Sequence, residues 1–135
     1  MKRTKGLRSR HRAIGSATKA EQRYQDAARE LGCIVCLLME SDQACGAVRI
    51  HHRTTGDLHG QKQLGQDAVV AMGDWHHQGV LEEGETVDSM RARFGPSLHH
   101  HKRDFLNWIA DTLGERSTAA LQRHQDTLLP EEVRL

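Results

Sequence analysis

The sequence has few aromatic residues and lacks long apolar runs. Aromatic residues make up 4% of the 135 positions and hydrophobic residues 37%. No apolar run approaches the roughly 20 residues that cross a membrane, and no apolar segment follows the basic start, which argues against a signal peptide. We therefore expect one small cytoplasmic domain with a modest core, of the kind that a bound metal ion often stabilises.

Positive and negative charges nearly balance over the whole chain, but they are unevenly distributed along it. The net charge is +1, yet residues 1–23 carry +7 and residues 24–135 carry −6. This pattern predicts a flexible basic arm over residues 1–17. The arm either solubilises the chain, or packs on its acidic body, or contacts phosphates without reading base sequence. The density of charge favours DNA contact by Lys2, Arg3, Lys5, Arg8, Arg10 and Arg12.

Cysteine is limited to three residues, an odd number that does not suit a disulfide framework. Cys33 and Cys36 are two residues apart, a spacing that lets two thiolates bind one Zn²⁺ with bonds of about 2.3 Å. A thioredoxin-like redox pair is the competing interpretation, but no strand-to-helix pattern precedes these cysteines. The third thiol, Cys45, lies in a polar loop downstream.

Histidine, in contrast, occurs as two adjacent pairs, His51-His52 and His76-His77. Imidazole binds metal ions and titrates near neutrality, so it suits both tasks that phosphodiester hydrolysis requires. Neighbouring residues on a strand point to opposite sides. One histidine of a pair can therefore bind a metal ion while its neighbour acts as a base.

Periodicity and capping signals predict a mixed α and β chain. Thr18 and Glu21 form a capping-box pattern at the start of a helix. Residues 53–66 contain almost nothing apolar and are expected to form a long loop, which in a compact domain is usually functional or mobile. We predict a helix over 19–31, a short helix capped by Asp74, and helices over 86–94, over 97–113 (the longest, capped by Ser97) and over 117–129. Strands are predicted over 47–51 and 68–72.

The order of these motifs resembles the HNH, or ββα-metal, endonuclease superfamily, and more specifically the Ref family of phage-type, RecA-dependent nucleases. The resemblance covers about residues 33–113. Its parts are Cys33-x-x-Cys36, Ile50-His51-His52, Trp75-His76-His77-Gln78-Gly79, and Gly95-Pro96-Ser97-Leu98 with Phe105.

This resemblance implies an α+β fold with a small ββα-metal core and a structural zinc site, flanked by N- and C-terminal helices. The nuclease domain would span residues 18–135, with the metal core at about 33–80 and a helical part at about 85–130. The implied activity is metal-dependent hydrolysis of single- or double-stranded DNA, with a RecA-type recombinase as partner. A bacterial or phage-infected cell would be the setting.

The resemblance also implies a role for each histidine. His51 and His77 would bind the catalytic Mg²⁺ or Mn²⁺, and His52 would be the general base. Cys33, Cys36 and His76 would bind the structural Zn²⁺. The chain departs from the family pattern at Gly73, where a fourth zinc-binding cysteine is usual, and at Leu81, where a further metal-binding histidine is common. Cys45 is the candidate for the missing zinc ligand.

An alternative function is a non-catalytic, zinc-stabilised module that binds nucleic acid. One Cys₃His zinc site would be sufficient for such a module. His51, His52 and His77 would then have no role. The remaining histidines carry weaker predictions. His99, His100 and His101 are expected on the first turns of a helix as a partly exposed face, with His100 the candidate for a phosphate contact. His59 is expected to be a substrate contact or to have no role.

Overall fold

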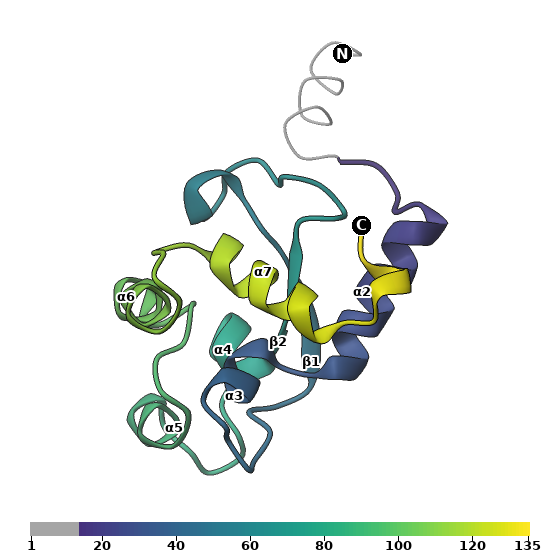
Figure 1. The fold of residues 1–135 in the computed structure, drawn as a ribbon. Helices are drawn as coiled ribbons and strands as arrows, with labels where there is room; N and C mark the ends of the chain where they lie inside the picture. Colours follow the sequence, from purple (N-terminus) through teal and green to yellow (C-terminus); the bar gives the residue numbers. More distant parts are fainter. Residues whose placement is uncertain (1–13) are drawn as a thin grey trace, which may run out of the picture.

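The computed structural model describes residues 14–135, so the six cations predicted to contact DNA lie outside the described residues. The described part is a small α+β fold with six α-helices and one two-stranded antiparallel sheet (Figure 1). In chain order the elements are α2 (Lys19–Leu31), α3 (Ile34–Leu38), β1 (Val48–His52), β2 (Val69–Gly73), α4 (Asp74–Gln78), α5 (Val87–Phe94), α6 (Lys102–Leu113) and α7 (Thr118–Leu128), with 3-10 turns at Thr55–Asp57 and Glu131–Val133.

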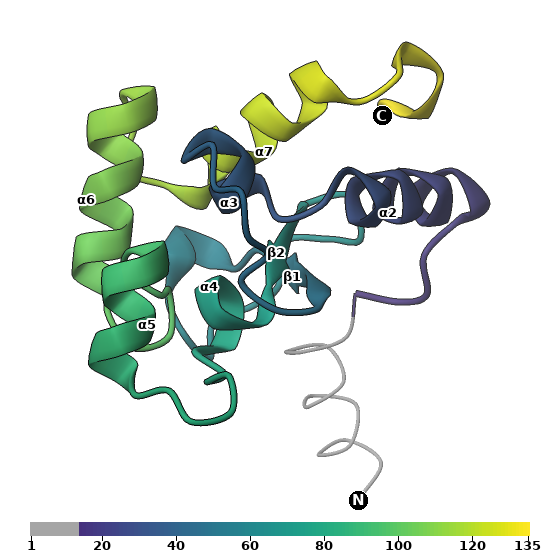
Figure 2. The same ribbon diagram turned by 90° about the horizontal axis from the view of Figure 1, so that it is seen from below.

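The two strands lie at the centre of the molecule. α2 lies on one side of the sheet and α4, α5 and α6 lie on the other, as Figures 1 and 2 both show. The register pairs Val48 with Gly73 and His52 with Val69, so His51 faces Val70 across the ladder. All five residues of β2 are buried, whereas β1 is partly exposed. The sheet therefore presents β1, with its histidine pair, toward the surface.

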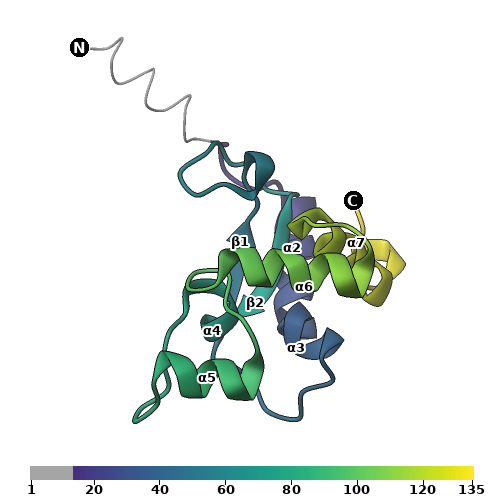
Figure 3. The same ribbon diagram turned by 90° about the vertical axis from the view of Figure 1, so that its left-hand side faces the viewer.

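A side chain of α7 satisfies the second edge of β2. The buried amide of Gln125 accepts a hydrogen bond from the Ala71 N–H at 2.9 Å and donates to the Val69 carbonyl at 3.1 Å. An unpaired backbone group at a buried strand edge would cost about 1–3 kcal/mol. Gln125 thus takes the place of a third strand at this edge. In Figure 3, α6 lies in front of the two strands. No helix of the described part is long and apolar enough to cross a membrane.

Local sequence signals explain the N-terminal half. Both bonds of the predicted capping box form, since Glu21 N donates to Thr18 Oγ1 at 3.1 Å and Thr18 N donates to Glu21 Oε1 at 2.8 Å. α2 ends at Gly32, whose φ of 106° is a value that residues with a side chain rarely adopt. The chain then turns directly into Cys33, the N-cap of α3.

Three local predictions are wrong. Asp74 is the first residue of α4 rather than its cap, because Gly73 holds the N-cap position. Ser97 does not begin a helix: its hydroxyl accepts from His99 N and His100 N, which closes a separate turn, and α6 starts at Lys102. α6 has 12 residues and is shorter than α2, which has 13.

The segment 53–66 is also more ordered than expected. It holds a 3-10 turn and a bridge between Thr54 and Gln63. The carboxylate of Asp57 caps α7, because it accepts from Ser117 Oγ at 2.9 Å and from the backbone N–H and hydroxyl of Thr118. This contact fixes the segment against α7 and positions one wall of the cavity described below.

Candidate metal centre

Three thiols and one imidazole meet beside the end of β2. Cys33 and Cys36 come from the N-terminal turn of α3, Cys45 from the loop before β1, and His76 from α4. All four residues are buried, and their candidate ligand atoms lie within 4.8 Å of one another. The four residues are therefore positioned to bind a metal ion, as the sequence predicted.

The spacing of the ligand atoms fits a tetrahedral ion. Bonds of about 2.3 Å to sulfur and about 2.0–2.1 Å to nitrogen place two sulfurs roughly 3.8 Å apart, and a sulfur and a nitrogen roughly 3.6 Å apart. The Cys45 and Cys33 sulfurs are 3.8 Å apart. The Nδ1 of His76 lies 3.5, 3.8 and 3.1 Å from the sulfurs of Cys33, Cys36 and Cys45. Sulfur and imidazole are the donors of structural zinc sites.

Hydrogen bonds orient His76 and polarise the thiols. His76 Nε2 lies 2.7 Å from the Phe94 carbonyl and donates to it, which leaves Nδ1 directed at the sulfurs. Burial lowers the pKa of His76, but its bonds to Cys33 and Cys45 outweigh burial and raise the pKa to about 10. The hydrogen bonds from Cys36 and Cys45 lower the pKa of the Cys33 thiol. The bonds with Cys33 and Cys45, together with burial, raise the pKa of the Cys36 thiol. The cluster therefore favours a thiolate, the form that binds metal, at Cys33.

Gly73 explains how Cys45 reaches the cluster. A Cβ atom at position 73 would lie 2.2 Å from Cys45 Sγ, far inside the van der Waals distance. The backbone of Gly73 itself has φ −70° and ψ 162°, which any residue can adopt. The glycine is therefore required by the sulfur of Cys45 and not by backbone geometry.

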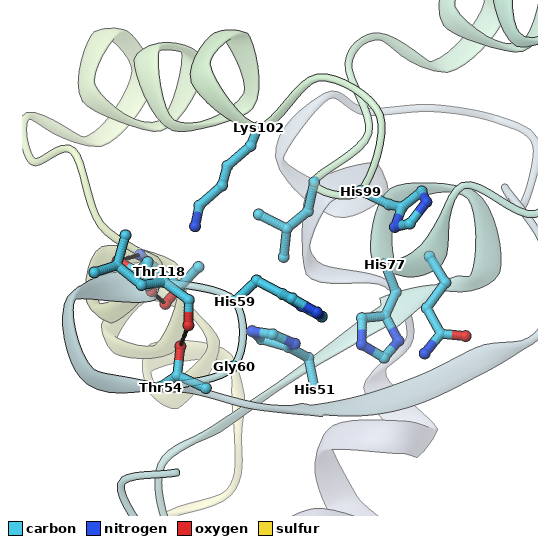
Figure 4. Close-up of a pocket in the computed structure, with 12 residues that line it drawn as sticks. His51, Thr54, His59, Gly60, His77, His99, Lys102 and Thr118 are labelled. Atoms are coloured by element: carbon cyan, nitrogen blue, oxygen red, sulfur yellow. Dashed lines mark hydrogen bonds between the residues drawn. The ribbon is translucent and has the colours of Figure 1, made fainter. Parts of the chain in front are cut away.

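A second pair of histidines meets on the other side of α4. His51 from β1 and His77 from α4 have ring centroids 5.1 Å apart, with the ring planes at 72°. Both line a cavity of about 420 Å³, which we call the histidine cavity. Figure 4 shows His51, His59 and His77 converging on this space, with His99 beside them and Lys102 reaching in from the opposite side. Other lining residues include Asp57, Gln78 and Thr118.

Both imidazoles of the pair are held in the neutral form that metal binding requires. Burial lowers the pKa of His51 to about 4, and the proximity of His77 adds to this shift. Burial also lowers the pKa of His77. The Nδ1 atom of His77 is buried and has no hydrogen-bond partner among the described residues. A buried polar atom without a partner is costly, and a metal bond would satisfy it.

The depressed pKa of His51 predicts a dependence of stability on pH. The unfolded value is 6.5 and the folded value about 4, so the unfolded chain binds more protons between these pH values. The contribution of His51 to the free energy of unfolding is therefore complete above pH 6.5, and it is lost as the pH falls toward 4. In urea unfolding without added Mg²⁺ or Mn²⁺, we expect the wild type to lose stability more steeply in this window than His51→Gln. His124→Gln serves as control, and parallel curves for wild type and His51→Gln would contradict the prediction.

His52 points away from His51, as alternation along a strand requires. The described residues that line the histidine cavity do not include it. Its Nε2 lies 2.8 Å from Gln66 Oε1, an oxygen that also accepts from Gln25 at 3.0 Å. His52 Nε2 must therefore donate, which leaves Nδ1 as a free proton acceptor. A charge on His52 would lower the pKa values of both His51 and His77.

The remaining predicted positions are less central. His99 and His100 are exposed and precede α6, and only His99 of this trio lines the histidine cavity. His100 Nε2 donates to the Gly79 carbonyl at 3.0 Å, and Ser97 N donates to His101 Nδ1 at 3.2 Å. Leu81 is 41% exposed beyond the end of α4 and offers no ligand.

Sequence reasoning missed Gln66, Asp57 and Lys102. Gln66 and Asp57 lie in a polar segment, and Lys102 was one cation among many. No local pattern distinguishes them, since each acquires its partner or its place through contacts across the fold.

Comparisons of the chain with protein-family models, with curated proteins and with solved structures find no match. Function is therefore inferred from the chemistry of the site.

Proposed function

We propose that the protein is a metal-dependent endonuclease that hydrolyses DNA phosphodiester bonds, built on an HNH-type ββα-metal core. The observation that carries the proposal is the meeting of His51 and His77 at the wall of the histidine cavity, with the buried Nδ1 of His77 lacking a partner. The two imidazoles come from a strand–strand–helix unit, in the order that the resemblance predicts.

Two metal sites with different tasks follow from this proposal. Cys33, Cys36, Cys45 and His76 would hold a structural Zn²⁺, because their sulfur and nitrogen donors and their spacing suit that ion. His51 and His77 would hold a catalytic Mg²⁺ or Mn²⁺, with oxygen atoms of water and phosphate as further ligands. When bound, this ion neutralises charge that develops on the phosphate.

The residues of the chain divide the remaining work. Because His52 donates its Nε2–H to Gln66, its Nδ1 is free to accept a proton from water. The bonds of Gln66 to Gln25 hold this arrangement in place. Lys102 extends from α6 into the histidine cavity, where its ammonium group can attract a phosphate (Figure 4).

The wild-type protein tests the proposal. Single- and double-stranded DNA are incubated with the full chain in Mg²⁺, in Mn²⁺ or in EDTA, with and without RecA filaments, and the products are resolved on a denaturing gel. We expect cleavage that requires the divalent ion. DNA binding without cleavage under every condition would overturn the proposal in favour of a non-catalytic, zinc-stabilised nucleic-acid-binding module.

Substitution of His52 tests the role of the base. We expect His52→Ala to lower the cleavage rate by about 10²–10⁴-fold, the usual contribution of a general base, with zinc content and melting temperature unchanged. His124→Ala, on α7, is the matched control. His59→Ala is measured beside it, because His59 lines the histidine cavity and His52 does not. Loss of activity in His59→Ala with full activity in His52→Ala would contradict the assignment.

A further inference from the structure

A second hollow shares two of its lining residues with the histidine cavity. This hollow, which we call the arginine groove, has a volume of about 750 Å³ and is lined by Arg29, Arg49, Asp74, His77 and Gln78, among others. His77 and Gln78 line both hollows, so α4 forms their common border. One of the two shared residues is His77, whose buried Nδ1 lacks a partner among the described residues.

Arg49 and His51 lie on the same side of β1, because they are two residues apart on one strand. Both contact α4: Arg49 Nε donates to Asp74 Oδ1 at 3.0 Å, and His51 meets the ring of His77. The side chain of Arg49 is 62% exposed, so the pair with Asp74 is weak and the other guanidinium N–H groups remain available. A cation thus lies next to the histidine pair along the strand.

Lys102 supplies a cation on the other side of the pair. It is the first residue of α6, where the helix dipole disfavours a positive charge, and it makes no ion pair with any residue of the described part. Among residues 14–135, Asp57 supplies the one carboxylate that lines the histidine cavity, and it is engaged by Ser117 and Thr118. A cation in this position is stabilised best by an external anion.

We propose that the histidine cavity and the arginine groove form one path for a DNA strand, with Lys102 contacting a phosphate on one side of the His51–His77 pair and Arg49 contacting a phosphate on the other. This inference rests on the proposed nuclease function and specifies how the substrate lies across the site. Successive phosphates of one strand match cations placed on both sides of a single scissile position. Contacts of this kind position the strand without reading its sequence.

Binding measured without cleavage tests the path. The full-length chain is titrated against a fluorescein-labelled single-stranded oligodeoxynucleotide without added divalent ion, and fluorescence anisotropy gives Kd over a series of salt concentrations. With single-stranded DNA, each phosphate contact contributes about 0.7 to the slope of log Kd against log salt. We expect Lys102→Gln and Arg49→Gln each to reduce the slope by about 0.7, and the double variant by about 1.4.

Two exposed arginines outside both hollows provide matched controls. The controls are Arg103→Gln, at the position beside Lys102 on α6, and Arg123→Gln, on α7. Melting temperatures confirm that all variants fold. If the slope of log Kd against log salt for Lys102→Gln or for Arg49→Gln equals that of its control, the proposed DNA path is overturned. Wild-type cleavage with unchanged slopes would refute the path alone, whereas reduced slopes without wild-type cleavage would refute the nuclease and leave a binding groove.

Discussion

Replacing Cys45 with alanine is expected to remove the proposed zinc ion and to lower the free energy of unfolding by more than about 4 kcal/mol, as the loss of a metal site does. The variant leaves two thiols and one imidazole around a position that needs four donors. Metal analysis by inductively coupled plasma mass spectrometry and urea unfolding measure the two effects. One equivalent of zinc and unchanged stability in Cys45→Ala would contradict the assignment.

Position 73 allows the lost zinc ligand to be restored within the same fold. A Cβ at position 73 points at Cys45 Sγ from 2.2 Å, so a thiol at position 73 would enter the space that Cys45 vacates. We expect Cys45→Ala/Gly73→Cys to regain one equivalent of zinc and most of the lost stability. Cys45→Ala/Gly73→Ala is the control: it fills the same space without a ligand and should remain free of zinc.

Replacing His77 with alanine is expected to reduce metal-dependent DNA cleavage by at least about 10³-fold, equivalent to about 4 kcal/mol of transition-state stabilisation. His77 carries the buried nitrogen without a partner among the described residues. Its ring lies next to that of His51 in the lining of the histidine cavity. Its neighbour His76 belongs to the other metal site, so zinc content should not change. Initial cleavage rates in Mn²⁺ provide the measurement.

His99→Ala is the control for this variant, because His99 lines the same cavity but is exposed and lies outside the strand–strand–helix unit. We expect its rate to stay within a few-fold of the wild type. If His77→Ala retained a rate similar to that of His99→Ala, the catalytic ion would not be held by His77.

Features that depend on neighbours in sequence were predictable. The capping box of Thr18 and Glu21 forms as expected, because both bonds join residues three apart. The assignment of Cys45 to the cluster also proved correct, since the loop before β1 must pass close to the end of β2 where Gly73 lies. The mixture of strands and helices followed from periodicity and capping signals.

Features that depend on distant contacts were not predictable. Ser97 has the residue type of an N-cap, but its hydroxyl is used by a turn and the helix starts five residues later. Gln66 and Asp57 lie in a segment with few apolar residues, and their partners His52 and Thr118 are 14 and 61 residues away. Asp57 is held by its contacts with Ser117 and α7, and Gln66 by its bonds to His52 and to Gln25 on α2.

Anomalous diffraction from crystals grown with zinc and soaked in Mn²⁺ would test the central claim, that neighbouring histidines of α4 serve two different metal ions. The account predicts a zinc peak among Cys33, Cys36, Cys45 and His76, and a separate manganese peak in contact with the imidazoles of His51 and His77. A zinc peak with no manganese between His51 and His77 would contradict the catalytic site and leave a protein with a single structural metal.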